Sequence, residues 1–216
     1  MKNDFIITLA WPEGLVKGSG ALYDLLLAKE GKYRVGHSAL ALVDSETSKV
    51  YYFDFGRYQT PDGFGRIRDT ETDPDTRIKQ KAKIKLEKIN NIEEILIEIS
   101  NNKSYHSEGA LYSSVISRIN FTAAFEYAKR WQEKGAIPYG PFVRNGTNCS
   151  RFVAKIVRKA RPSFLKKLRL KFPFTISPSP KRNVSIANHH YYVVKNQKCI
   201  EVKKSKLQAY FSSIEI

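Results

Sequence analysis

Hydrophobic and polar positions in the first quarter of the chain follow a pattern that predicts β-strands. An apolar run over residues 4–11 stops at Pro12 and Gly14, two residue types that favour turns. Two more runs, 33–43 and 49–55, are rich in apolar and aromatic residues, and a short polar linker (DSETS) separates them. This pair is the clearest hairpin signal in the sequence.

Three segments have the spacing of amphipathic helices. Leu and Tyr recur at helical spacing over residues 20–30, and Gly31 is a suitable C-cap. Asn120 can cap a helix over residues 121–134. A third helix is predicted over residues 149–160, where apolar residues recur on one face.

The remaining segments carry weaker signals. Residues 56–80 are rich in Gly, Pro, Asp and Thr and are predicted to form a long loop, a kind of segment that is often functional. Residues 81–89 favour a strand, whereas 91–100 fit either a helix or a second strand. The tail over 191–216 can supply one or two strands. The pattern predicts one α+β domain over residues 1–216, with an antiparallel sheet packed against helices.

The charge balance indicates an anionic partner. The 216 residues include 37 Lys and Arg against 21 Asp and Glu, a formal net charge of +16. This excess favours contact with nucleic acid, acidic lipid or an anionic cell-wall polymer, although a solvated basic surface gives the same count. No helix-turn-helix, RNA-recognition or zinc-finger motif is present, so no specific nucleic-acid partner is expected.

The two cysteines and the apolar runs give hints about the compartment. Cys149 and Cys199 are too few for a disulfide framework, and a single bridge between them is left open. No stretch reaches the roughly 18 apolar residues that a membrane span needs. The N-terminal run lacks a convincing small-residue cleavage site and is interpreted as a strand, so the default compartment is the cytoplasm, with export left open.

Cys149 is the strongest candidate for a nucleophile. Turn-forming residues precede it, and Phe152, Val153 and Ile156 after it share one face of a helix. We therefore expect the cysteine at a helix N-terminus, where free N–H groups and the helix dipole stabilise a thiolate and lower the thiol pKa. A buried, inert cysteine at a helix start is the alternative.

A cysteine nucleophile needs a base, and His37 in the predicted hairpin is the candidate. A structural histidine in a strand is the alternative. A tight turn over 44–49 brings residue 37 opposite residue 55 or 56, and a shift of one residue places Asp54 opposite or diagonal to His37 on the same face. A carboxylate there can fix the imidazole tautomer and stabilise the imidazolium. An aspartate in a turn at the strand end is the alternative for Asp54.

Two other patterns are discounted. Asp54, Phe55 and Gly56 spell the magnesium-binding triplet of protein kinases, but the glycine-rich loop and the catalytic-loop pattern are missing. His189 and His190 are adjacent, so in a strand they point to opposite faces, and no Asp, Glu or Cys lies at ligand spacing around them. We therefore expect no metal site and no cofactor.

The segment around Cys149 resembles the nucleophile motif of NlpC-type papain-like amidases and endopeptidases. In that motif a Pro-Tyr-Gly follows a helix, and a glycine-bearing loop leads to Cys-Ser at a helix start with apolar residues after it. The segment VGHSALALVD resembles the base motif of the same family, and Asp54 falls where the family carries the residue that orients the imidazole. The resemblance covers residues 33–56 and 120–158, and its nucleophile motif consists here of Pro138, Tyr139, Gly140, Gly146, Cys149, Ser150, Phe152 and Val153.

The order of the two motifs is the reverse of that in ordinary family members, since His37 precedes Cys149. Circularly permuted members show this order, among them the YiiX/YaeF-like bacterial proteins and the lecithin:retinol acyltransferase-like enzymes. The resemblance thus implies a circularly permuted papain-like fold. Arg151 departs from the small residue that is often found there, and Asp54 from the more common His, Asn or Gln.

The resemblance also implies a mechanism. His37 would accept the thiol proton, and Cys149 would attack a carbonyl to form an acyl-enzyme that water or another acceptor resolves. The backbone N–H of Cys149 and a second donor would hold the oxyanion. Tyr139 is the candidate for that donor, with aromatic packing under the loop as its alternative. Ser150 is assigned with Tyr139 to the oxyanion or substrate pocket.

Three functions stay open at this point. A cysteine amidase or peptidase that acts on cell-wall peptides suits both the resemblance and the charge. A lipid acyltransferase or hydrolase suits the lipid-acting permuted relatives and residues 164–174, where basic and apolar residues interleave as in a segment that contacts an anionic membrane. A helix with a solvated basic face explains the same segment. The third possibility is a basic binding protein without catalysis. Neither the oligomeric state nor the role of the basic segment 161–183 is predicted.

Overall fold

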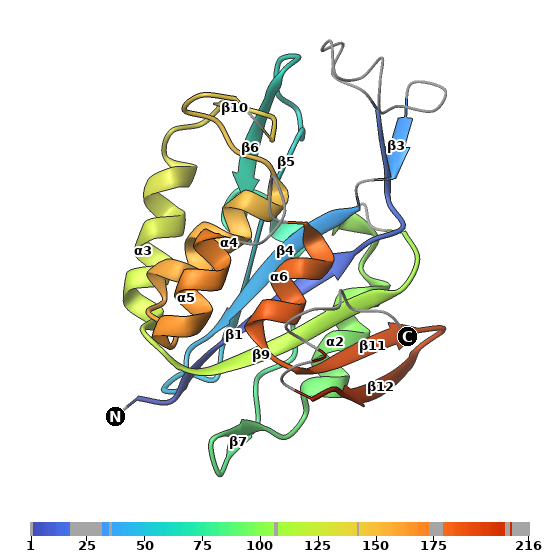
Figure 1. The fold of residues 1–216 in the computed structure, drawn as a ribbon, viewed down its shortest axis with the longest axis vertical. Helices are drawn as coiled ribbons and strands as arrows, with labels where there is room; N and C mark the ends of the chain where they lie inside the picture. The colour runs from blue at the N-terminus through green and yellow to red at the C-terminus, as the bar shows by residue number, and fades with distance from the viewer. Residues whose placement is uncertain are drawn as a thin grey trace.

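A large antiparallel sheet forms the centre of the protein, which we describe from a computed structural model (Figure 1). The structure describes residues 2–17, 32–34, 36–105, 108–141, 143–172, 179–205 and 208. Within these residues the sheet has eight strands in the order β10-β6-β5-β4-β1-β9-β11-β12, each antiparallel to its neighbours. The strands are β1 (Asp4–Trp11), β4 (His37–Val43), β5 (Val50–Gly56), β6 (Phe64–Arg68), β9 (Leu111–Ile119), β10 (Ile137–Pro138), β11 (His190–Lys195) and β12 (Lys198–Lys203).

Helices and short hairpins surround this sheet. The described helices are α2 (Ile92–Asn101), α3 (Phe121–Gln132), α4 (Cys149–Lys159), α5 (Phe164–Lys171) and α6 (Pro180–Ala187), with 3-10 turns at Pro74–Thr76 and Lys103–Tyr105. Two small antiparallel pairs join β2 (Leu15–Lys17) to β3 (Lys32–Arg34) and β7 (Ile84–Lys85) to β8 (Lys88–Ile89). The predicted helix over residues 20–30 lies outside the described residues.

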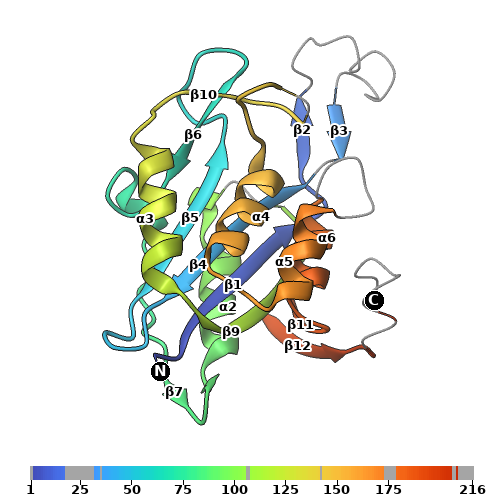
Figure 2. The same ribbon diagram turned by 60° about the vertical axis from the view of Figure 1, so that its left-hand side comes forward.

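The sheet has a hydrophobic core on each face because alternate residues of its strands point to opposite sides. Leu40 and Phe53 pack with α3 and α4 on one face, whereas Ala41 and Tyr52 pack with α2 on the other. Figure 2 shows α3, α4 and α5 in front of the strands and α2 behind them. The predicted α+β class, a sheet packed against helices, is confirmed.

The β4–β5 hairpin has the predicted position. Ala39 pairs with Asp54 and Val43 with Val50, so the same register places residue 37 opposite residue 56. Asp54 is therefore diagonal to His37 and on the same face. The predicted single run over 33–43 is divided, because Gly36 has φ +69 and a Cβ there would lie 2.5 Å from the carbonyl oxygen of Trp11. The chain turns at this glycine, and β4 begins at His37.

Several predicted elements differ in the structure. Residues 56–80 are not only loop, because Phe64–Arg68 forms β6 on the edge of β5. The strand predicted over 81–89 is instead the hairpin β7–β8, in which Leu86 and Glu87 take positive φ in a two-residue turn. The segment 91–100, left open between helix and strand, forms α2.

The helices and the tail follow the pattern more closely. The helix expected over 121–134 spans Phe121–Gln132, and the Asn120 side chain accepts a hydrogen bond from the Ala123 N–H as its N-cap. The helix expected over 149–160 is α4. The tail supplies two strands, β11 and β12, of which the first begins at His190.

Candidate active site

The N-terminus of α4 carries the candidate nucleophile, Cys149. The preceding residue, Asn148, has extended backbone angles, and its side chain accepts a hydrogen bond of 2.8 Å from the Arg151 N–H. Phe152 and Val153 are fully buried against the sheet and anchor the first turn. The helix start is thereby fixed with its free N–H groups and positive dipole end at the cysteine, which is 4% exposed.

The imidazole of His37 lies beside this thiol. The two side chains are close enough that each shifts the pKa of the other, and the backbone of Ser38 also favours the thiolate. On its other side the ring meets Asp54, with 3.2 Å between His37 Nε2 and Asp54 Oδ2. Since Nε2 faces the carboxylate, Nδ1 is the ring nitrogen left for the sulfur. The ring also stacks on the buried Trp11, with centroids 5.9 Å apart.

Cys149 and His37 shift each other's pKa in opposite directions. Burial raises the pKa of the Cys149 thiol, but the hydrogen bond to His37 and the charge of the imidazolium outweigh burial and lower it. Burial lowers the pKa of His37, but hydrogen bonds to Asp54 and then to Cys149 raise it to about 9. Both shifts favour a thiolate–imidazolium pair at neutral pH, the reactive form of a cysteine nucleophile.

A network of buried polar groups holds the carboxylate of Asp54. Arg68 donates to both of its oxygens, at 3.1 Å from Nε and 2.7 Å from an Nη atom. The hydroxyls of Tyr52 and Tyr58 donate to Oδ2 at 3.0 and 2.9 Å. Burial raises the pKa of Asp54, but the hydrogen bonds from His37 and Arg68 hold it well below its usual range. The carboxylate is therefore charged and fixed behind the imidazole.

Sequence reasoning did not find Tyr58 and Arg68. Both lie in the segment that was predicted as a loop, although Arg68 is the last residue of β6 and pairs directly with Asp54. The guanidinium of Arg68 lies over the Tyr58 ring at 3.4 Å from its centroid, so the two side chains form one packed unit. An arginine next to apolar residues in FGRIR was the available signal, since a buried Arg needs a carboxylate partner.

Tyr139 and Ser150, which the sequence assigned to one pocket, have different surroundings in the structure. The ring of Tyr139 stacks on Phe55 with centroids 5.5 Å apart, and Arg57 lies over it. This contact fits aromatic packing, the alternative that the sequence left open. Ser150 is buried next to the nucleophile, with its Oγ 3.9 Å from the Cys149 sulfur, and its carbonyl accepts a hydrogen bond from Asn183.

The structure also shows where the remaining candidate residues lie within its described part. Cys149 and Cys199 are both free thiols, so the bridge left open between them is absent. No cluster of three or more His, Cys, Asp or Glu in the described part of the chain could hold a metal ion. His190 lies 3.8 Å from the Glu201 carboxylate. None of the described helices is long and apolar enough to cross a membrane.

Comparison with protein families identifies the chain's relatives. The model of a family described as type VI secretion system effector TseH-like matches residues 6–163. The chain belongs to the TseH-like family. Among solved structures, the crystal structure of the type VI secretion system effector TseH matches with a TM-score of 0.64 and 19% sequence identity, covering 93% of this chain and 98% of TseH. No curated protein matches.

Membership of the TseH-like family confirms the coarser part of the sequence interpretation. The likeness to TseH extends over nearly the whole chain and is consistent with the predicted papain-like fold, and at 19% identity it concerns the fold alone. The link to YiiX/YaeF-like and lecithin:retinol acyltransferase-like proteins stays a prediction, as do the roles of the site residues.

Proposed function

We propose that this TseH-like effector is a cysteine hydrolase that cleaves amide bonds in cell-wall peptides. The observation that supports this most directly is the position of the Cys149 thiol beside the His37 imidazole, with the charged Asp54 behind the ring. A thiol at a helix N-terminus beside a histidine held by a carboxylate is the arrangement that thiol-dependent acyl transfer requires. The positive net charge suits an anionic polymer as substrate.

The proposed mechanism uses these residues in order. The thiol proton moves to His37, and the Cys149 thiolate attacks the amide carbonyl to give a tetrahedral intermediate. The imidazolium returns the proton to the leaving amine, which leaves a thioester on Cys149. Water, deprotonated by His37, then hydrolyses the thioester and frees the thiol. Asp54 stabilises the imidazolium throughout without taking its proton.

The backbone of the helix start is the proposed source of oxyanion stabilisation. As the first residue of α4, Cys149 has an N–H with no partner inside the helix, and it points from the positive end of the dipole. Donors of this kind contribute about 3 kcal/mol to acyl transfer. Because the Tyr139 ring is stacked on Phe55, we assign it to the support of the loop rather than to the oxyanion.

Digestion of isolated cell-wall sacculi tests the proposal. We expect the protein to release peptide fragments with new amino termini, detected by mass spectrometry, and the Cys149→Ala change to reduce the rate by about 10⁴-fold or more. The matched control is Cys199→Ser, which replaces the other free thiol and should leave the rate unchanged. Turnover that survives Cys149→Ala would show that the thiol is not the nucleophile.

A second candidate, a lipid acyl hydrolase or transferase on the same site, is favoured by one feature of α5. Four large apolar side chains on or directly after this helix are exposed to solvent, and basic residues lie between them. Such a surface fits peripheral contact with an anionic membrane. The exposed residues are Phe164 (76%), Leu165 (70%), Leu168 (43%) and Phe172 (59%).

Vesicle assays separate the two candidates. A lipid enzyme should release fatty acid from anionic phospholipid vesicles and lose most of that activity in Leu165→Ser/Leu168→Ser. The control is Leu86→Ser, which removes an even more exposed leucine (86%) on the turn between β7 and β8. If sacculi are digested and vesicles are not, the lipid alternative is wrong.

A further inference from the structure

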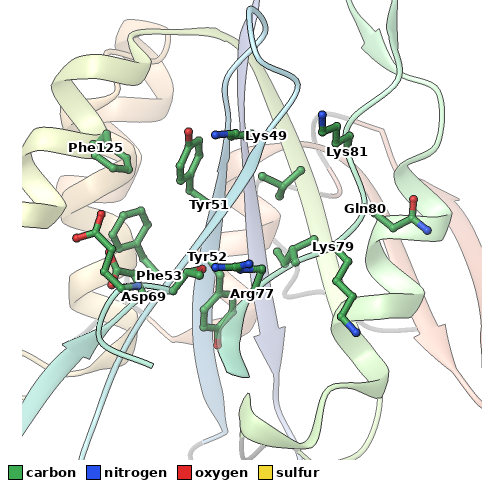
Figure 3. A pocket seen from close by; sticks show the side chains of 14 residues that line it. Lys49, Tyr51, Tyr52, Phe53, Asp69, Arg77, Lys79, Gln80, Lys81 and Phe125 are labelled. Atoms are coloured by element: carbon green, nitrogen blue, oxygen red, sulfur yellow. The ribbon is translucent and has the colours of Figure 1, made fainter. Parts of the chain in front are cut away.

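A cavity of about 400 Å³ lies along the first half of β5, apart from the candidate active site. A cavity of this size can hold a small ligand or a short segment of a polymer. Figure 3 shows Tyr51 and Phe125 on one side of the cavity and Lys79, Gln80 and Lys81 on the other. We call it the β5 cavity.

The inner walls of the β5 cavity are fixed. On the strand side, Val50 and Tyr52 are 8% and 0% exposed, so the strand backbone is covered and a ligand can meet only the side chains around it. On the other side, the Lys79 and Gln80 N–H groups donate to the Glu98 carboxylate of α2 at 2.6 and 2.9 Å. The cavity is therefore preformed, and the exposed side chains around it determine what it can bind.

An aromatic cluster forms one wall of the cavity. Tyr51 packs against Phe121 and Phe125 of α3, with ring centroids 5.6 and 5.2 Å apart. Phe121 and Phe125 also stack on each other, so the Tyr51 ring is held in place while part of it stays exposed. The face of an aromatic ring carries partial negative charge and attracts polarised C–H groups, such as those on the apolar face of a sugar ring.

Unpaired cations surround the cavity. Lys49, Arg77, Lys79 and Lys81 are exposed, and none of them forms an ion pair with another described residue. Figure 3 shows Lys49 and Arg77 between the aromatic wall and the two other lysines. Like charges around one cavity repel each other, and a ligand with several negative charges relieves this repulsion.

The carboxylates beside the cavity do not neutralise these cations. Asp69 and Glu71 also line it, but both are bound by Lys129, at 2.7 and 2.8 Å. The hydroxyls of Tyr51 and Thr70 form no hydrogen bond with another residue in the described part of the chain, so they are available to a ligand. The cavity thus combines positive charge, an aromatic wall and hydrogen-bonding groups.

We propose that the β5 cavity binds a short segment of an anionic polysaccharide whose sugars carry carboxylates. A sugar ring packs on Tyr51, and its carboxylates pair with Lys49 and Arg77. A nucleic-acid strand fits less well, because its bases stack on successive aromatic side chains, whereas the wall opposite Tyr51 consists of lysine and glutamine side chains. The site is separate from the proposed hydrolase chemistry and would hold the protein on an acidic polymer.

Fluorescence anisotropy with labelled tetragalacturonate tests this proposal. We expect it to bind at least about tenfold more tightly than two competitors. One is tetraglutamate with blocked termini, which has the same number of carboxylates but no sugar, and the other is the methyl ester of tetragalacturonate, which keeps the sugar rings without the charges. Equal binding of tetraglutamate or of an oligothymidylate with four phosphates would overturn sugar recognition, as would no binding of tetragalacturonate.

Matched substitutions test the location. Lys49→Gln/Arg77→Gln should weaken tetragalacturonate binding by about tenfold or more. Lys85→Gln/Lys88→Gln on the β7–β8 hairpin makes the same change in net charge and should have less than about a twofold effect. All four side chains are exposed, so folding should be unaffected, which circular dichroism checks. Equal loss of binding in the two variants would contradict the proposal.

A change in the aromatic wall separates sugar packing from attraction between charges. Tyr51→Leu keeps an apolar side chain against Phe121 and Phe125, and it should weaken tetragalacturonate binding by about fivefold without affecting tetraglutamate. Unchanged affinity for tetragalacturonate would exclude packing on Tyr51. Cys149→Ala should bind tetragalacturonate normally, so failure of this site and failure of the proposed catalysis are distinguishable.

Discussion

The two free thiols of the chain occupy regions that differ in the charge beside the sulfur, a histidine at Cys149 and a carboxylate at Cys199. Cys149 begins α4 beside His37, and its pKa is lowered although the side chain is buried. Cys199 lies on the edge strand β12, where partial burial and then the charge of Glu93 raise its pKa to about 11. Burial acts against the thiolate at both places. The imidazole, held by a charged carboxylate, reverses the outcome at Cys149 alone.

The largest expected difference between the two regions is in stability. Asp54→Asn leaves the buried Arg68 without its carboxylate, and removal of one partner of a buried pair costs about 3–5 kcal/mol. Glu93→Gln changes the corresponding carboxylate near Cys199, which is exposed, and should cost less than about 0.5 kcal/mol. Urea denaturation measures both. Similar losses would mean that the buried network contributes no more than a surface charge.

The next largest difference is in thiol reactivity. At pH 7 we expect iodoacetamide to alkylate Cys149 on the order of 100-fold faster than Cys199, since the pKa of Cys149 is lowered and that of Cys199 is raised. In His37→Ala the advantage should fall to less than about tenfold, because burial then raises the pKa of both thiols. Mass spectrometry of tryptic peptides gives both rates. A Cys149 that stays fast without His37 would contradict the assignment of the base.

The pH dependence of stability provides a further test of the pair formed by Cys149 and His37. The raised pKa of His37 gives stability that is complete below pH 6.5 and is lost as the pH rises through about 9. The lowered pKa of Cys149 acts in the opposite sense, because it gives stability above the pKa of a free thiol. The two contributions oppose each other, so the pair gives a weaker pH dependence of stability than the histidine would give alone.

Removal of the Cys149 thiol should reveal how His37 alone contributes to the pH dependence of stability. In Cys149→Ala, Asp54 still favours the imidazolium, and the free energy of unfolding should fall by about 1 kcal/mol between pH 6.5 and 9. Wild type and Cys199→Ser should show a smaller decline, because the thiol and imidazole shifts oppose each other. Urea titrations across that pH range provide the measurement, and parallel profiles for all three proteins would exclude the ion pair.

The smallest expected effect is on stability and comes from the two helix caps. Asn148 and Asn120 cap α4 and α3 with equivalent side-chain hydrogen bonds. Replacing either residue with Ala should cost about 1 kcal/mol of stability. Only Asn148→Ala should also slow the alkylation of Cys149, since that cap fixes the helix end that stabilises the thiolate. Equal alkylation rates in the two variants would show that α4 positions the sulfur without its cap.

The sequence alone could locate the β4–β5 hairpin and the start of α4, because both depend on local signals. The DSETS linker and the alternation beside it determine the register that places Asp54 diagonal to His37. The cap Asn148 and the apolar spacing after Cys149 determine where α4 begins. The meeting of these two distant segments is a tertiary fact, and only the resemblance to a known family anticipated it.

The elements that were missed depend on distant partners. β6 is a five-residue strand whose sequence reads as loop until it lies against β5. β9 was not predicted although it is a central strand. Its buried polar residues Ser113 and Ser114 interrupt the apolar pattern that indicates a buried strand. Ser114 is satisfied there by Thr8 and the Val184 carbonyl, both remote in the chain. Short or polar segments acquire their structure from such contacts, which periodicity does not report.

The central position of β1 has a consequence for biosynthesis. This strand leaves the ribosome well before one of its neighbours, β9, whose Ile119 pairs with Asp4. Loop closure over such a separation is slow, and until it occurs an apolar strand has an unpaired edge that invites aggregation. The sulfur emerges later still. A nascent chain therefore holds His37 long before Cys149, and under the proposed mechanism a translation product that stops short of Cys149 has no nucleophile.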